Sequence, residues 1–417
     1  MSAPPSARPS YAAVLRVPHA RRTFAAALAG RLSYGTAPLA VLLCLTRATG
    51  SYALAGTVMA LSGAVTVLLS PLRAGLVDRY GPRRALTPLA LVHAGLLAAL
   101  AAVSAAPGVP ALASAALAVA AGAFPPPLGP TMRAVWSQLV DDPRLLQRAY
   151  SLDGVAEELL FVSGPLIVGA VVHWAPPAAA VALGALLLVA GTVAFVASPA
   201  VTGAAPRTVP GRPVRRPGTV RALAAPVLAA AGAGLAVGAL ELLVLAFAEE
   251  RGYGDDAAAW VLAALSAGSA VGGLLNGAVH WRLSARARLP LLALAPGAAV
   301  AVAGLAPGLA ALTVAAAGAG LFIAPALTTA YLLADESAPP GFRTRAGAWV
   351  NMAVNAGGSA GAAAVGALVG RLPLGLCFTM LGTVCCATAL AAVPFGPSRG
   401  RSPVPQQPST APVAPPG

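Results

Sequence analysis

The sequence has few charged residues, and one basic side chain is missing altogether. Only 10% of its 417 residues are charged, against about a quarter in an average soluble domain. Lysine is absent, so all 27 basic residues are arginine. In contrast, 58% of the residues are hydrophobic and the mean hydropathy is +0.79. This composition excludes an ordinary soluble globular protein and predicts an all-α polytopic membrane protein.

Cysteine is also scarce, and its positions argue against a metal or redox site. The four cysteines lie inside apolar runs without a Cys-x-x-Cys pair, so they predict buried packing rather than metal or redox chemistry. The net charge of +14 would favour nucleic acid in a soluble protein, but these arginines lie in short loops between apolar runs. There they set membrane topology. We expect no metal, no cofactor, no nucleic-acid partner and no enzymatic activity.

Twelve stretches are long and apolar enough to span a bilayer, which needs about 20 mostly apolar residues. The first six are expected at 23–46, 51–73, 84–106, 110–133, 150–173 and 177–197, and the second six at 222–247, 257–280, 289–306, 309–333, 346–370 and 373–395. We therefore predict two six-helix bundles, at 21–197 and 222–396. A linker at 198–221 joins them, and residues 1–20 and 397–417 are predicted to be disordered tails.

The arginines are distributed unevenly between the two sides that this topology predicts. With the N-terminus inside, the cytoplasmic tails and loops hold 23 of the 27; Arg47, Arg251 and Arg371 fall outside, and Arg31 lies within a span. Cytoplasmic loops carry an excess of arginine and lysine. The distribution predicts a multi-pass protein of the cell membrane with both termini in the cytoplasm.

A short charged segment, Gly75-Leu76-Val77-Asp78-Arg79-Tyr80-Gly81-Pro82-Arg83-Arg84, connects the second and third spans. Gly75 lets another helix pack closely, and Asp78 can act as an anionic partner for the positive end of a helix. Gly81 and Pro82 favour a tight turn. Arginines hold the segment on the cytoplasmic side, namely Arg79, Arg83 and Arg84. The alternative is a positively charged loop that only fixes topology.

The pattern Gly-x-x-Asp-Arg-x-Gly-x-Arg-Arg in this segment resembles the signature loop of the major facilitator superfamily. The resemblance implies twelve helices in two pseudo-symmetric six-helix halves, a substrate cavity between them near the bilayer midplane, and alternating access. It also implies a monomer, and a contact of Asp78 with the start of the span at 346–370 that steadies the state closed toward the cytoplasm. We therefore assign the segment a gating role.

The two predicted halves repeat each other at a fixed offset of 198 residues. This shift lays Gly75-Leu76-Val77-Asp78 on Gly273-Leu274-Leu275-Asn276 and Pro127 on Pro325. The same shift pairs Asp153 and Glu157 with Asn351 and Asn355. Because Asn276 lacks the acid of Asp78, we expect the gating contact to be asymmetric between the halves.

Charged groups within the spans are the first candidates for function, because a charge at the bilayer centre costs about 3 kcal/mol and should face a cavity or a partner. Arg31 lies in the first span and Glu241 in the seventh, and the resemblance implies that these spans line the cavity from opposite halves. We expect Arg31 to bind an anionic or polar substrate group. Glu241 is expected to couple protons or bind a cation, since burial favours the neutral form of a carboxyl group. Tyr34 is a further cavity candidate from its helix position. A structural salt bridge or snorkelling to the headgroups is the alternative for the two charges.

A second polar group lies near the predicted cytoplasmic end of the first half. Asp153 and Glu157 are four residues apart and so share a helix face, and Arg133 ends the preceding span. We interpret them as a charge network that forms an inner gate; the alternative is ordinary charge flanking a loop. Asn351 and Asn355 fit substrate contact and helix packing equally well.

The function that these features favour is secondary active transport, with the proton gradient as energy source. Residues 163–169, Ser-Gly-Pro-Leu-Ile-Val-Gly, are similar to a Gly-Pro motif of proton-coupled exporters. They favour efflux of a small amphipathic molecule or drug by proton antiport. The alternatives are uptake of a sugar or organic anion by the same mechanism and, from a different class, a membrane-embedded sensor or enzyme.

Overall fold

The computed structural model describes residues 10–106, 110–202, 219–339 and 341–393, and these residues are almost entirely helical. The N-terminal half contains α1 (Tyr11–Arg16), α2 (Ala20–Thr49), α3 (Tyr52–Tyr80), α4 (Pro82–Ala105), α5 (Ala111–Gly122), α6 (Leu128–Leu139), α7 (Pro143–Trp174), α8 (Pro177–Val196) and α9 (Pro199–Thr202). The C-terminal half contains α10 (Thr219–Glu250), α11 (Asp255–Ala278), α12 (Ala285–Ala303), α13 (Leu309–Ser337), α14 (Arg343–Leu368) and α15 (Leu374–Ala391).

Ten of the described helices are long and apolar enough to cross a membrane: α2, α3, α4, α7, α8, α10, α11, α12, α13 and α15. The two remaining predicted spans correspond to α5 with α6, and to α14. Helix α14 is 26 residues long but begins Arg343-Thr344-Arg345 and carries two asparagines, which lower its hydropathy. The all-α prediction with two six-helix bundles is therefore confirmed.

The span predicted as one continuous helix at 110–133 is instead broken. Helix α5 ends at Gly122 and α6 begins at Leu128, because the intervening residues include three consecutive prolines, at 125–127. Proline has no backbone N–H and disfavours helical geometry in the residue before it. Buried Arg73 from α3 satisfies the carbonyl groups freed at this break, donating to Ala123 O at 3.0 Å and Gly122 O at 3.5 Å.

The first twenty residues differ in part from the predicted loose tail. Residues 11–16 form α1, whose N-terminus is capped by the hydroxyl of Ser10. Val14 of this helix is fully buried, and the hydroxyl of Tyr11 donates to the carbonyl of Leu274 in α11 at 2.5 Å. The short helix therefore bridges the two halves. The tail at 397–417 and most of the linker, residues 203–218, lie outside the described residues.

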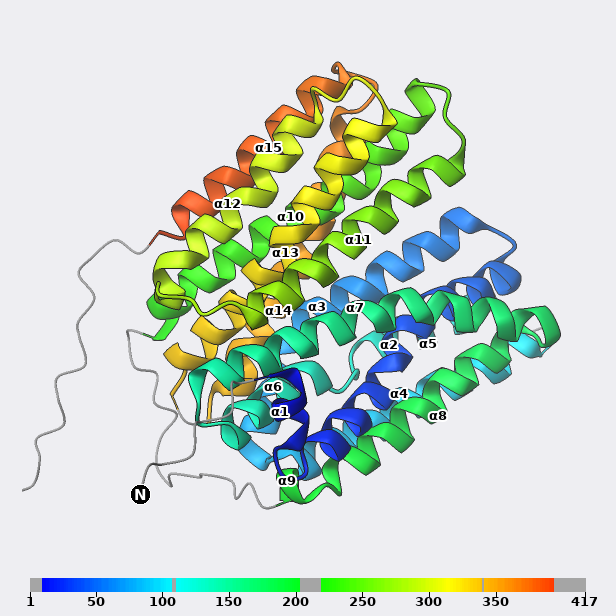
Figure 1. Cartoon of the computed structure of the whole chain (residues 1–417). Helices are drawn as coiled ribbons and strands as arrows, with labels where there is room; N and C mark the ends of the chain where they lie inside the picture. Colours follow the sequence, from blue (N-terminus) through cyan, green and yellow to red (C-terminus); the bar gives the residue numbers. More distant parts are fainter. Residues whose placement is uncertain (1–9, 107–109, 203–218, 340, 394–417) are drawn as a thin grey trace, which may run out of the picture.

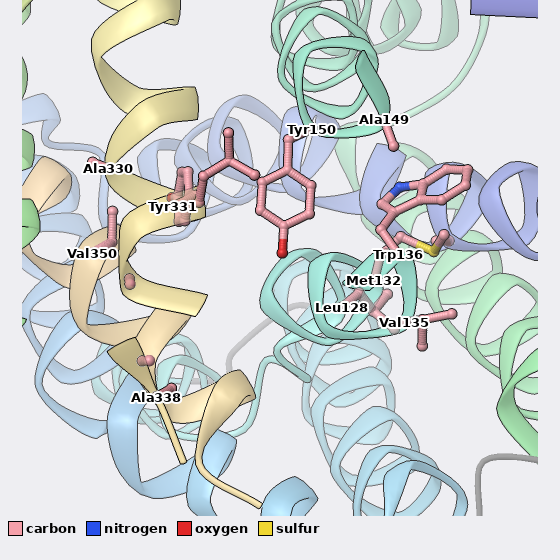
Figure 2. Packing of buried hydrophobic residues seen from close by; sticks show 14 of the residues in the cluster. Leu128, Met132, Val135, Trp136, Ala149, Tyr150, Ala330, Tyr331, Ala338 and Val350 are labelled. Carbon is pink, nitrogen blue, oxygen red and sulfur yellow. The ribbon is translucent and has the colours of Figure 1, made fainter. Parts of the chain in front are cut away.

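The buried apolar side chains show how the halves are joined. One cluster draws on both halves and includes Leu128, Trp136 and Tyr150 with Tyr331 and Val350. Figure 2 shows this packing: the Tyr150 side chain points toward α6, which carries Met132 and Trp136, and Tyr331 lies on its other side. A second cluster lies wholly within the C-terminal half and a third wholly within the N-terminal half.

The halves thus share a core at one end only. We call this the closed end; it carries the α3–α4, α6–α7, α11–α12 and α13–α14 connections. The opposite end, where the α2–α3, α10–α11 and α14–α15 connections lie, we call the open end. In Figure 1 the two bundles meet at the left and diverge toward the right.

Candidate functional site

A cavity of about 550 Å³ lies between the two halves. Helices α2 to α7 supply most of its wall, and α13 and α14 complete it from the C-terminal half. Most of the lining is apolar or glycine, for example Val41, Met59 and Phe161. The polar lining residues are Tyr34, Ser62, Thr66, Ser70, Arg73, His93, Arg133, Tyr150, Glu157, Glu158, Thr328, Tyr331, Asn351 and Asn355. A ligand here would meet an apolar surface together with polar groups from both halves.

Four charged side chains from three helices form a cluster beside the cavity, and two of them, Arg133 and Glu157, line it. Arg31 Nη1 lies 2.7 Å from Asp153 Oδ1, and Arg31 Nη2 lies 3.0 Å from Glu157 Oε1. Arg133 Nε lies 3.0 Å from Asp153 Oδ2, and its Nη2 pairs with Glu157 Oε2. Each guanidinium therefore bridges both carboxylates, and the cluster has no net formal charge. We call Arg31, Arg133, Asp153 and Glu157 the charge cluster.

The sequence places these four groups together in a simple way. Asp153 and Glu157 are one turn apart on α7, so both carboxylates point from the same face. Arg31 comes from α2, and Arg133 comes from the second turn of α6, directly after the helix break. Asp153 is fully buried, whereas the side chain of Glu157 is 27% exposed. Glu157 is therefore the acidic member that a ligand in the cavity can reach.

The charge cluster also contacts the C-terminal half, through Tyr331 of α13. The guanidinium carbon of Arg133 lies 3.8 Å from the centre of the Tyr331 ring, which is a close cation–π contact. The Tyr331 hydroxyl in turn donates to Asn351 Oδ1 of α14 at 3.4 Å, and Asn355 Nδ2 donates to the backbone carbonyl of Asn351 at 2.8 Å. A chain of polar contacts thus connects the ion pairs of one half to the asparagines of the other.

The predicted contact between Asp78 and the start of the 346–370 span is present. The Asp78 carboxylate accepts hydrogen bonds from two backbone N–H groups in the first turn of α14, those of Thr344 at 3.2 Å and Arg345 at 2.9 Å. These groups are the unsatisfied donors at the positive end of the helix. A Cβ atom at Gly75 would collide with the guanidinium of Arg345, so glycine allows the two helix ends to approach. We call this contact the Asp78 latch.

The turn that follows the latch matches the sequence expectation. Gly81 has a positive φ of 81°, which glycine adopts readily, and Pro82 begins α4. The side chains of Arg79, Arg83 and Arg84 are exposed.

The pseudo-symmetric position in the other half makes a different contact. The backbone carbonyl of Asn276, the counterpart of Asp78, accepts a hydrogen bond from the side-chain amide of Gln147. Arg288 Nη1 donates to Gln147 Oε1 at 2.9 Å, and the indole of Trp281 donates to Asn276 Oδ1 at 3.0 Å. At the closed end, the two halves are therefore joined by a carboxylate at Asp78 and by a neutral side-chain amide at Gln147. The gating contact thus differs between the two pseudo-symmetric positions, as predicted.

Two candidates occupy positions other than those expected. Arg31 is only 2% exposed and directs its guanidinium at two carboxylates; it does not line the cavity. Glu241 of α10 has an exposed side chain and does not line the cavity either. The two charges therefore do not face one cavity from opposite halves in this structure. Tyr34, Asn351 and Asn355 do line it.

Sequence reasoning missed nine polar residues of the cavity wall, and three of them make contacts that matter for the site. Arg73 caps the broken span, and His93 Nδ1 lies 2.8 Å from the carbonyl of Ala121 at the end of α5. Glu158 hydrogen-bonds to Ser269 of α11, in the other half. Glu158 and Arg73 could have been singled out as Arg31 was, because each is a charge inside an apolar run. Their partners, however, depend on which helices pack together.

Comparison with known proteins agrees with this geometry. A family model described as Major Facilitator Superfamily matches residues 23–362. No curated protein sequence matches the chain significantly.

Several solved structures share the fold. A human organic anion transporter (TETRAN) superposes with a TM-score of 0.69 at 14% identity, covering 92% of this chain and 100% of that one. A bacterial homologue of the iron transporter ferroportin, in an outward-facing state with soaked iron, gives a TM-score of 0.69 at 16% identity, with 89% and 97% covered. The proton:xylose symporter XylE gives 0.67 at 13% identity, with 92% and 97% covered.

Proposed function

The chain belongs to the major facilitator superfamily, and we propose that it exports a small amphipathic molecule in exchange for protons. The family is one of membrane transporters rather than enzymes, so transport of a small molecule across a bilayer is its function. The observation that carries the finer proposal is the cavity itself. Its apolar wall suits a hydrophobic body, and the partly exposed Glu157 and the Arg133–Tyr331 pair beside it offer polar contacts.

Alternating access supplies the mechanism. The halves share a core at the closed end, so opening that end requires breaking the Asp78 latch and the Gln147–Asn276 contact while the open end closes. The exposed arginines near the closed end are Arg16, Arg21, Arg22, Arg79, Arg83, Arg84, Arg144, Arg282 and Arg286. Because cytoplasmic loops are rich in arginine, we assign this end to the cytoplasm, which makes the structure outward-facing. Both termini are then cytoplasmic, and the protein acts as a monomer in the cell membrane.

The polar groups at the site have different roles. The charge cluster holds α2, α6 and α7 as one unit, because removing any one charge would leave its partner buried and unpaired. Arg31 positions the two carboxylates, whereas Tyr34, Asn351 and Asn355 contact the substrate from both halves. A substrate that contacts both halves can favour one arrangement of the halves over the other.

Flux measurements in everted membrane vesicles test the proposal. A growth-inhibition panel, with and without the protein, first selects an amphipathic dye or drug to which the protein confers resistance. Everted vesicles with an acidic interior should then accumulate that compound, and a proton ionophore should abolish the accumulation. Accumulation only in right-side-out vesicles with an acidic exterior would overturn export and favour uptake by proton symport.

A further inference from the structure

We propose that Glu158 of α7 is the proton-binding site of this transporter and that its carboxyl group controls the contact between α7 and α11. This inference rests on the proposed proton-coupled transport and names a residue for it. Glu158 is the sixteenth of the 32 residues of α7, so it lies at the middle of a membrane-spanning helix. It lines the cavity between the two halves.

The contacts of Glu158 differ from those of the other acids on the same helix. Its Oε1 hydrogen-bonds to the hydroxyl of Ser269 on α11, while its Oε2 is buried without a hydrogen-bond partner. Asp153 and Glu157 each pair with two arginines. Two guanidiniums thus balance two carboxylates, and Glu158 is the acid of α7 that forms no ion pair with a cation of the described residues.

The groups packed around Glu158 offer it no compensating positive charge. Helix α11 carries its acidic residues at its first two positions, Asp255 and Asp256, and has no basic residue; α8 has no titratable residue. On the remaining neighbours the titratable or charged groups are Tyr11 and Arg16 of α1; Arg21, Arg22, Arg31, Tyr34, Cys44 and Arg47 of α2; Arg133 of α6; Arg144, Arg148, Tyr150, Asp153, Glu157 and His173 of α7 itself; and Tyr331, Asp335 and Glu336 of α13. None of the arginines among them forms an ion pair with Glu158. Arg31 and Arg133 are already committed to the charge cluster. An ionised carboxyl group buried without a cation is costly, so this position favours proton uptake.

Glu158 also lies where α7 of the N-terminal half contacts α11 of the C-terminal half. Helices α7 and α11 pack antiparallel at the closed end, where Gln147 meets Asn276 and Val155 lies against Gly273. We call this line of contacts between α7 and α11 the seam. The Glu158–Ser269 hydrogen bond lies farther along it, at the border of the cavity. When α7 and α11 separate, the hydrogen bond between Glu158 and Ser269 breaks and the carboxyl group becomes exposed to water, which solvates its ionised form.

Proton binding and the arrangement of the halves are therefore linked. The neutral carboxyl group favours the closed α7–α11 seam seen here, and the ionised group favours its opening. The cavity can deliver a proton to the Glu158 carboxyl group, and opening of the α7–α11 contact releases that proton on the other side. A carboxyl group that changes its exposure in this way carries one proton per cycle.

Infrared difference spectroscopy of the purified protein in liposomes tests this without a substrate. The difference between acidic and alkaline pH should contain the C=O band of a protonated carboxylic acid that loses its proton as the pH rises. Glu158→Gln should remove that band. Glu241→Gln is the matched control, since Glu241 is also an acid within a helix but lies outside the cavity, and it should leave the band in place.

Ser269→Ala provides a second variant, which keeps the carboxyl group but removes its hydrogen-bond partner. The band should persist at a shifted frequency, because the carboxyl group remains and only its hydrogen bond is lost. This shift identifies the band as that of Glu158 even if Glu158→Gln fails to fold. A band that survives in Glu158→Gln, or one that disappears in Glu241→Gln, overturns the proposal. Because no substrate is present, a failure of proton-driven flux in vesicles would contradict the proposed export and leave this result standing.

Discussion

The Asp78 latch allows a quantitative prediction, because its two hydrogen bonds join α3 directly to the start of α14. Asp78→Asn keeps one oxygen acceptor but replaces the other with an amide N–H₂ group, which cannot accept from a backbone N–H. The negative charge at the helix N-terminus is lost as well. A hydrogen bond to a charged group contributes about 1.5–3 kcal/mol, and a charge at a helix end about 0.3–1 kcal/mol.

Part of this energy is recovered by the remaining hydrogen bond and by water, since Asp78 is only partly buried. We therefore expect Asp78→Asn to destabilise the latched conformer, relative to the unlatched one, by about 1–2 kcal/mol. This change lowers the ratio of latched to unlatched conformers about 5–30-fold. Substrate affinity should change less than the rate of interconversion, because Asp78 does not line the cavity.

Nitroxide labels on Tyr52→Cys and Trp260→Cys, in a protein whose native cysteines are replaced, measure this ratio by pulsed electron resonance. Both positions lie at the open end and are 77% and 73% exposed. Asp78→Asn should increase the population with a short distance. Asp142→Asn is the control, because that carboxylate caps its own helix by accepting from Arg144 N and bridges no halves. An unchanged distance distribution in Asp78→Asn, or an equal change in the control, would refute the latch.

The packing of the N-terminal half makes two further predictions for unfolding measurements in detergent. Asp153→Asn should lower stability by about 3–5 kcal/mol because it leaves buried Arg31 short of a partner, whereas Glu157→Gln, at a partly exposed carboxylate, should cost clearly less; equal losses would contradict this order. Gly164→Ala would push a methyl group into the backbone of Gly35 and should cost about 1–3 kcal/mol. Its control is Gly169→Ala on the same helix, where a Cβ meets no atom within 4 Å, and a smaller loss in Gly164→Ala than in this control would refute the close α2–α7 contact.

The features that the sequence predicted well depend on local signals. The length of the apolar runs predicted the two six-helix halves. The sidedness that the arginine distribution indicates stays a prediction. Asp153 and Glu157 were grouped with Arg133 because a spacing of four residues places two side chains on one helix face. The contact of Asp78 followed from a loop motif and its family resemblance.

The features that it missed depend on which helices pack together. The prolines at 125–127 do not interrupt the hydropathy, so the fourth span read as continuous although its hydrogen bonds are broken there. Arg31 and Asp153 are 122 residues apart, and no spacing rule connects them. Glu241 and Glu158 are both acids in apolar runs, and only the three-dimensional packing separates an exposed carboxyl group from one at the seam between the halves.

Paired distances at the two ends of the molecule test the central claim most directly. One label pair, Tyr52→Cys with Trp260→Cys, reports on the open end, and a second pair, Asp142→Cys with Arg282→Cys, reports on the closed end. As conditions shift the protein between its conformers, the account predicts that one distance shortens whenever the other lengthens. Distances that change in the same sense, or a closed-end distance that never changes, would contradict alternating access between two rocking halves.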